Sequence, residues 1–243
     1  MRCSTGVSSR PPAESMLTSS AIIDERFDLT QDFTVSVELN FGDNPPGSDG
    51  IALLLHNDPF GPAAIGGRGS DRGFRGVLDG FAAEFATSGS TTPSTGFADS
   101  DSTFTTTPFT LGAIEDGAWH RVDLFWDAGT GTLSYLFDDA FVASFDDNLI
   151  NTYLGGSNNA FFGLTAGTGS GSNLQQARFL GVEATVGSGS DGQREVAWGD
   201  VPTSPLAPDV ELTGPGLTAT LNGAASFDES SGIFTLTPAA TQQ

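Results

Sequence analysis

The segment from 33 to 41 alternates strictly between apolar and polar residues. Its apolar positions are Phe33, Val35, Val37, Leu39 and Phe41. Successive side chains of a β-strand point to opposite faces, so this period of two predicts a strand with one buried face. Residues 51–55 are instead continuously apolar, over a length too short for a helix. This second pattern predicts a strand that is covered on both faces.

Several other short apolar segments are bounded by Gly, Ser, Thr, Asn or Asp. Val122, Leu124 and Trp126 alternate with Asp123 and Phe125, and the turn-forming residues 127–131 connect them to the apolar segment 133–137. This arrangement predicts a β-hairpin. Further strands are expected at 161–164, 177–182, 217–221 and 233–236. Many short strands without a helical period predict an all-β fold, namely a two-sheet antiparallel jelly-roll sandwich.

The length of 243 residues suits one such sandwich. We expect an N-terminal extension at 1–20 and the sandwich at 21–186. Residues 187–210 are rich in Gly, Ser and Pro and are predicted to be a linker. The remaining residues, 211–243, are expected to form a C-terminal β-hairpin.

The formal net charge is −21, and all nine basic residues are Arg. Nucleic acids and anionic membranes are bound by clustered Lys or Arg, so neither is expected as a partner. A carboxylate-rich surface suits high ionic strength, but the charge fits a merely acidic secreted protein equally well; the complete absence of Lys slightly favours the saline setting. Cys3 is the single cysteine, so an intramolecular disulfide cannot form. No apolar stretch is long enough to span a membrane.

Residues 1–17 lack the apolar core of a signal peptide. Three explanations remain open: a leader has been removed, export is unconventional, or the chain is one piece of a longer polypeptide.

Eight blocks of the sequence carry a resemblance to a known family. They are 27–35, 48–52, 55–59, 64–67, 73–76, 114–122, 163–169 and 175–176. Together they resemble the bacterial L-type lectins, relatives of the legume lectins, over roughly residues 27–186. The resemblance implies a concanavalin A-like sandwich that binds carbohydrate without catalysis, at an extracellular or cell-surface location.

In that family a sugar is held by an Asp next to a cis peptide, by backbone N–H groups of a glycine loop, and by a metal-binding loop. Asp49 matches the Asp, and Gly66 and Gly67 match the glycine loop. The resemblance places a further loop beside them, with the candidate residues Gly169, Ser170 and Asn173. A carboxylate can accept hydrogen bonds from two vicinal hydroxyls, and glycine lets a backbone approach closely. The alternative is that residues 48–50 simply form a turn. Candidates for stacking on a sugar ring are Phe60, Phe74, Phe97 and Phe104.

The metal-binding loop of the family is only partly retained. Glu84 matches it, but Ala86 stands where the family has its bridging Asp, and Ser88 and Ser90 replace its aromatic residue and Asn. The remaining candidate ligands for Ca²⁺ are Glu84, Asp99 and Asp101. Because a hard cation takes six or more oxygens, we expect at most a weak calcium site.

Catalysis is not expected. His56 and His120 are the two histidines and therefore the two candidates for a base near neutral pH. Glycosidases of related sandwich folds carry paired carboxylates at a fixed spacing on one strand, a pattern this sequence lacks.

The ends of the chain depart from the family. Its opening strands are missing at the N-terminus, while 221–228 and 233–238 resemble them at the C-terminus. The tail could fold back in a circularly permuted chain, complete a neighbouring copy, or begin a truncated tandem domain. Donation to a neighbour predicts self-association into a homo-oligomer or an extracellular filament, a second hypothesis for the function. The candidate assembly residues are Leu217, Ala219, Leu221, Ile233, Phe234 and Leu236.

Overall fold

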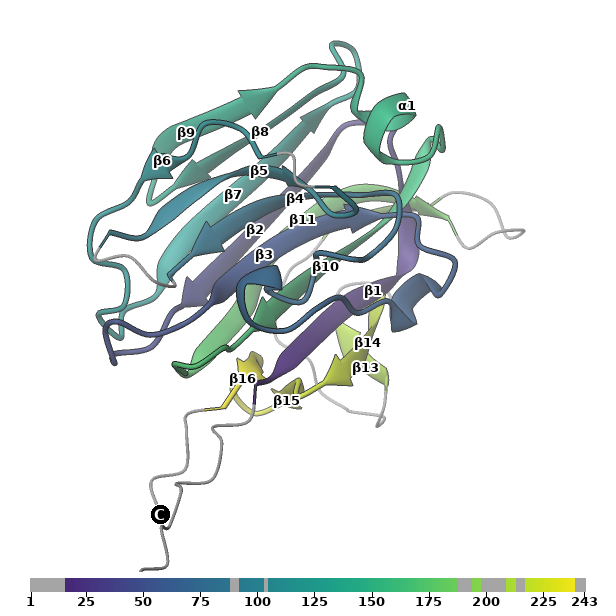
Figure 1. The fold of residues 1–243 in the computed structure, drawn as a ribbon. Helices are drawn as coiled ribbons and strands as arrows, with labels where there is room; N and C mark the ends of the chain where they lie inside the picture. The colour runs from purple at the N-terminus through teal and green to yellow at the C-terminus, as the bar shows by residue number, and fades with distance from the viewer. Residues whose placement is uncertain are drawn as a thin grey trace, which may run out of the picture.

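The computed structural model of the chain describes residues 16–87, 92–102, 105–187, 194–197, 209–212 and 217–238. These residues form antiparallel strands and few helical turns, which confirms the all-β prediction (Figure 1). The strands are β1 Thr18–Asp28, β2 Phe33–Asn40, β3 Gly50–His56, β4 Gly80–Ala86, β5 Ser94–Asp99, β6 Phe109–Thr110, β7 His120–Asp127, β8 Thr132–Phe137, β9 Ala140–Phe145, β10 Asn159–Gly167, β11 Gln175–Gly187, β12 Arg194–Ala197, β13 Asp209–Leu212, β14 Leu217–Gly223, β15 Ser226–Asp228 and β16 Ile233–Thr237. The helical segments are η1 Gly61–Ala63, η2 Gly69–Asp71 and α1 Leu149–Tyr153. None of these described helices is long and apolar enough to cross a membrane.

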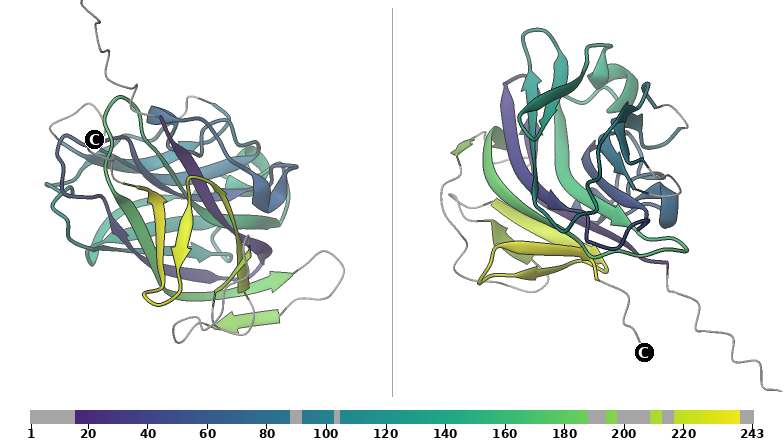
Figure 2. Two further views of the ribbon diagram at one scale, coloured as in Figure 1. Left: turned by 90° about the horizontal axis from the view of Figure 1, so that it is seen from below. Right: turned by 90° about the vertical axis from the view of Figure 1, so that its left-hand side faces the viewer.

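The strands form two layers that lie face to face (Figure 2). One layer has the strand order β6-β5-β4-β3-β10-β1, and the other has the order β11-β2-β7-β8-β9. The strand β1 connects them, because it pairs with β10 along most of its length and with β11 at Arg26 and Phe27. Hydrogen bonding therefore continues from one layer into the other, as in a jelly-roll sandwich.

Aromatic side chains fill the space between the layers. Phe85 of β4 and Phe97 of β5 meet Tyr135 of β8 edge-on, with ring centroids 5.9 and 5.0 Å apart. The Tyr135 hydroxyl is satisfied by Thr95, 2.8 Å away. Edge-to-face contacts of this kind add to the free energy gained by burying the rings. In β2, the predicted apolar positions face this core and the polar positions face outward, so the period of two is confirmed.

A second, smaller cluster covers the outer face of β3 and β4. The segment between these two strands folds back over them and contributes Ala64, Phe74 and Val77. These side chains pack on residues of the sheet, which are Ala52, Leu54, Ala82 and Ala98. Strand β3 is therefore buried on both faces, as its continuous apolar run predicts.

The C-terminal strands complete the edges of β1 and β11 within the same chain. Strand β14 pairs with β1, from Ser19 opposite Gly223 to Ile23 opposite Ala219. Strand β16 pairs with the first residues of β11, and the Phe234 ring meets Phe179 edge-on at 5.8 Å. The predicted single hairpin is wrong in detail, because β14 pairs with β13 and β16 pairs with β15. Of the candidate assembly residues, Leu217, Ala219, Phe234 and Leu236 are buried, and Leu221 packs against the same core. Ile233 is half-buried and lies opposite Asp228 in the β15–β16 hairpin.

The expected domain boundaries need two corrections. Residues 18–20 belong to β1 rather than to an extension, because their backbone pairs with β10 and, from Ser19 on, with β14. Their side chains are all polar, so the sequence shows no apolar pattern that predicts this strand. The predicted linker contains β12, which pairs with β11, and the first residues of β13. Residues 1–15 of the extension and most of the linker lie outside the described residues.

Candidate functional site

Asp49 lies immediately before β3, at a point where three segments of the chain meet. Its backbone N–H donates to the carbonyl oxygen of Gly167, at the end of β10, with an N–O distance of 2.8 Å. Its carbonyl oxygen accepts the N–H of Thr87, just beyond β4, at 3.1 Å. The Ser48–Asp49 peptide bond is cis. Asp49 is thus fixed by its neighbours in the sheet, and 6% of its surface is exposed.

Glycines surround the Asp49 side chain. A Cβ atom on Gly169 would lie 2.5 Å from the carboxylate oxygen Oδ2, and one on Gly69 would lie 3.5 Å from it. Gly50 has a φ of +125°, and a Cβ there would collide with the carbonyl oxygen of Phe85. Glycine is required at Gly50 and Gly169 because backbone and carboxylate approach so closely. The exposed Ser170 follows Gly169 at the rim of this site.

The glycine of this loop that lies beside Asp49 is not one of the two predicted from the sequence. The N–H groups of Gly66 and Gly67 donate to the carbonyl oxygens of Gly73 and Arg75, at 2.7 and 2.9 Å. These two glycines therefore shape their own loop, and their N–H groups point into it. The glycine that approaches Asp49 is Gly69, at the start of η2, and its N–H donates to the carbonyl oxygen of Thr168.

Asn173 lies beneath the rim and not on it. Its Nδ2 donates to Glu115 Oε1 at 3.1 Å, and its carbonyl oxygen accepts the hydroxyl of Thr237 in β16. Burial raises the pKa of Glu115, while hydrogen bonds from Asn173 and from the N–H of Gly47 oppose the rise. Asn173 is 3% exposed and its amide holds neighbouring segments together; its role as a sugar ligand stays a prediction.

The candidate calcium ligands do not converge. Glu84 lies opposite Gly96, whereas Asp99 lies opposite Phe81, three positions further along the β4–β5 pair. Three positions correspond to about 10 Å. Asp101 lies beyond Asp99 and outside β5, and burial and the Asp99 carboxylate raise the pKa of Asp101. Within the part of the chain that the structure describes, no three His, Cys, Asp or Glu residues are grouped to hold a metal. The residues implied by the resemblance therefore do not fit Ca²⁺, and Glu84 pairs with Arg72 instead.

The three candidate stacking residues that the structure describes do not line the Asp49 site. Phe74 and Phe97 are buried, and Phe104 lies outside the described residues. Phe60 is 78% exposed, but it follows the end of β3 remote from Asp49. A sugar at Asp49 would therefore meet backbone and polar groups rather than the ring of Phe60, Phe74 or Phe97.

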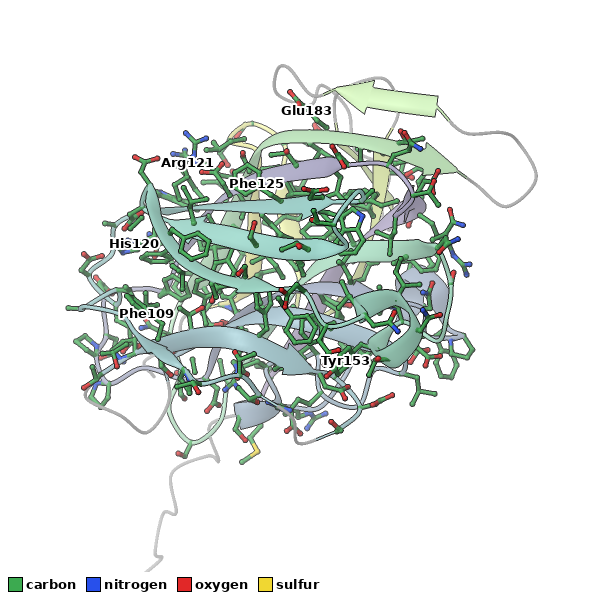
Figure 3. The ribbon with its side chains drawn as sticks, turned by 90° about the horizontal axis from the view of Figure 1, so that it is seen from above. Phe109, His120, Arg121, Phe125, Tyr153 and Glu183 are labelled. Carbon is green, nitrogen blue, oxygen red and sulfur yellow. The ribbon has the colours of Figure 1, made fainter. Side chains whose placement is uncertain are left out.

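A hollow of about 340 Å³ lies on the other layer, where β2, β7 and β8 place Thr34, Phe125 and Ser134 side by side. Figure 3 labels Phe125 together with Arg121 and Glu183, which belong to this layer. The two acidic residues of the hollow, Asp32 and Asp127, accept the N–H groups of Ala128 and Thr130. Their carboxylates therefore stabilise the β7–β8 turn, and the glycine-lined Asp49 remains the stronger candidate site.

Comparison with solved structures places this geometry in a known fold. Lectin II from Ulex europaeus superposes with a TM-score of 0.55, at 14% sequence identity, over 69% of this chain and 80% of that lectin. The acidic lectin of winged bean, solved in complex with methyl-α-D-galactose, superposes with a TM-score of 0.53, at 18% identity, over 84% of this chain and 80% of that one. This chain has the L-type lectin fold. No protein-family model matches its sequence. At sequence identities of 14% and 18%, the similarity to these lectins establishes the L-type lectin fold and nothing about individual residues. The role of Asp49 therefore has to be argued from its own surroundings.

Proposed function

We propose that this chain is a non-catalytic carbohydrate-binding module with its sugar site at Asp49. The observation that carries the proposal is the glycine-lined carboxylate. Asp49 is fixed by backbone hydrogen bonds to Gly167 and Thr87, and Gly69 and Gly169 lie against its side chain. A rigid acceptor flanked by bare backbone suits a ligand that presents several hydroxyl groups at close range.

The chemistry of the site favours a neutral sugar. A carboxylate accepts hydrogen bonds from two vicinal hydroxyls, and such charge-assisted bonds are stronger than neutral ones. The exposed hydroxyl of Ser170 supplies a further polar contact at the rim. The chain carries a formal charge of −21, so glycans with carboxylate or sulfate groups would be repelled.

The two histidines have surroundings that suit structural roles. His56 is fully buried, and burial lowers its pKa to about 4. Its Nδ1 accepts a hydrogen bond from the N–H of Asp58, so the lone pair of this nitrogen is used within the fold. His120 contacts Asp116 and Asp138 near the surface, at 3.3 and 2.8 Å. We therefore propose binding without catalysis, at an extracellular or cell-surface location.

The alternative function, a filament subunit that donates its C-terminal strands, receives no support from the pairing of β14 and β16 within their own chain. Size-exclusion chromatography with light scattering tests it. We expect a monomer at all accessible concentrations. Oligomers that grow with protein concentration, and that are lost when residues 217–243 are deleted, would favour the filament.

A glycan array tests the proposed function. The chain is expected to bind a set of neutral glycans, and the Asp49→Asn variant is expected to lose that binding while its melting temperature changes little. Asp43→Asn is the matched control, because Asp43 is an exposed carboxylate in the loop that leads to Asp49. Binding that survives Asp49→Asn, or an array on which no glycan is bound, would overturn the proposal.

A further inference from the structure

The ion pair between Arg72 and Glu84 is buried on the outer face of β4. Both residues are 7% exposed, and Nη2 of Arg72 donates to Oε2 of Glu84. Nη2 of Arg75 lies 3.6 Å from the same oxygen. A carboxylate at this depth is costly unless it is paired, and the two guanidinium groups provide the compensating positive charge.

Arg72 also touches both segments that fix Asp49. Its Cδ lies 3.0 Å from the position of a Cβ on Gly50, the residue after Asp49. Its Cα lies 3.0 Å from the corresponding position on Gly167, whose carbonyl oxygen accepts the Asp49 N–H. The pair with Glu84 therefore anchors a residue that lies close to both Gly50 and Gly167, the residue after Asp49 and the residue that accepts its N–H.

The backbone of Arg72 connects the pair to the glycine beside the carboxylate. Arg72 ends η2 in a left-handed conformation, with a φ of +48°, and its N–H donates to the carbonyl oxygen of Gly69 at 2.9 Å. A left-handed conformation is uncommon for a residue with a side chain and persists where its surroundings fix it. The residue that carries the paired guanidinium is thus hydrogen-bonded directly to Gly69, the glycine that lies beside the Asp49 carboxylate.

A divalent cation does not fit at this position. Calcium takes six to eight oxygen ligands, whereas Glu84 offers one carboxylate and Ala86 offers none. Asp99 is too far along the sheet, and Arg75 donates to the carbonyl oxygens of Asp99 and Ser102, between Glu84 and that turn. A cation would therefore have to displace two arginines that already neutralise Glu84.

We propose that Arg72 acts in this chain as a built-in cation. Paired with Glu84, it positions Gly69 and Asp49, so that sugar binding needs no divalent metal. The statement about sugar rests on the proposed function, but the positioning role can be measured without any ligand.

The positioning role is tested by amide hydrogen exchange, followed by NMR. In Glu84→Gln and in Arg72→Met, the N–H groups of Asp49 and Gly69 should exchange about tenfold faster than in the native chain. Arg72→Lys keeps the positive charge and should retain most of the protection. The matched control is Glu38→Gln, which removes the carboxylate from the Arg178–Glu38 pair on the other layer and should leave both amides unchanged.

Two results would overturn the positioning role. One is unchanged exchange at both amides in Glu84→Gln, and the other is acceleration spread evenly over all strands. Should Glu84→Gln and Arg72→Met fail to fold, Glu84→Asp decides, because the shorter side chain weakens the pair with Arg72: faster exchange confined to Asp49 and Gly69 supports the role, and unchanged exchange at both amides contradicts it.

Independence from metal is tested at constant ionic strength, because the chain is highly charged. The melting temperature of chelator-treated protein should not change when CaCl₂ or MnCl₂ is added, and calorimetric titration with CaCl₂ should show no binding heat. A calcium-dependent rise in melting temperature that disappears in Glu84→Gln would overturn the proposal. Glycan binding should be equal in chelator and in CaCl₂. If no glycan binds in either condition, the proposed function fails, while the exchange and melting measurements still decide the role of Arg72.

Discussion

The two faces of β4 are covered by different kinds of structure. On the inner face, Phe81 and Phe85 meet aromatic rings of the second layer, including Phe145 at 4.6 Å and Tyr135 at 5.9 Å. On the outer face, Ala82 lies in a small apolar cluster and Glu84 forms an ion pair, both beneath the segment that connects β3 to β4. The inner face therefore holds the two layers together, whereas the outer face positions one loop against Asp49.

This comparison separates two kinds of stability. Side chains on the inner face contact several strands, so their loss affects the whole sandwich. The outer cluster rests on one connecting segment, which can open locally while the strands stay paired. Substitutions on the inner face should consequently lower the stability more, and over more of the molecule, than substitutions on the outer face.

The largest effect is expected on the inner face. Phe85→Ala removes a fully buried ring that contacts Phe41, Tyr135 and Phe137, and it should lower the free energy of unfolding by about 4 kcal/mol. Urea denaturation followed by fluorescence and by circular dichroism measures it. Both probes should shift together, and a loss below about 1 kcal/mol would contradict the importance given to this face.

An acid-sensitive group lies on the outer face of β3. His56 alternates with the inward-facing Leu55, and burial lowers its pKa from 6.5 to about 4. The unfolded chain therefore binds a proton at a higher pH than the folded chain. Stability from this histidine is complete above pH 6.5 and is lost as the pH falls toward 4, by roughly 3 kcal/mol in all.

The His56 contribution is measured as a difference between variants, because many carboxylates titrate in the same range. The fall in melting temperature between pH 6.5 and 4.5 should be smaller in His56→Gln than in the native chain. His120→Gln serves as the comparison, since His120 is also buried but its two ring nitrogens face the carboxylates of Asp116 and Asp138. Equal slopes for the native chain and His56→Gln would contradict the prediction.

A smaller and local effect is expected from Phe74→Ala. Phe74 is fully buried in the outer cluster, but its loss should lower the global free energy of unfolding by only about 2 kcal/mol, because the segment can detach without unfolding the layers. Limited proteolysis should cut first between residues 58 and 79. Cleavage that begins in the strands would show that the two faces are not independent.

The smallest effect is expected at an ion pair that is only half-buried. Glu38→Gln disrupts the pair with Arg178, which lies on the outward side of β2 and β11. Such a pair contributes less than about 1 kcal/mol, so the melting temperature should change little. A fall in melting temperature as large as that of Glu84→Gln would show that the half-buried pair stabilises the fold as much as the buried one does.

The same contrast explains which features the sequence could predict. The alternation in β2 and the apolar run at 51–55 predict their strands, because each pattern reports directly on the burial of its own residues. The turn at 127–131 was predicted for a similar reason, and Gly131 has a φ of +69° there. Asp49 was found through a resemblance, and its place before β3 agrees with it.

The remainder of the site depends on contacts that no local pattern reports. Gly69 and Gly169 are a hundred positions apart in the sequence and both approach the Asp49 side chain. Gly66 and Gly67 are glycines of the same loop as Gly69, but their N–H groups form hydrogen bonds within that loop. Arg72 was not singled out, since an arginine in a glycine-rich loop looks solvated until its partner is known. Asn173 was predicted at the rim, but Glu115 and Thr237 hold it below.

The pairing of β14 with β1 has a consequence for how the molecule is made. Ser19 lies opposite Gly223, so this contact cannot form until residue 223, about two hundred positions later, has emerged from the ribosome. Until then, the first strand exposes an unsatisfied backbone edge of the kind that recruits other chains. Nascent copies that each carry many more carboxylates than arginines repel one another, and this repulsion protects the unfinished sandwich during synthesis.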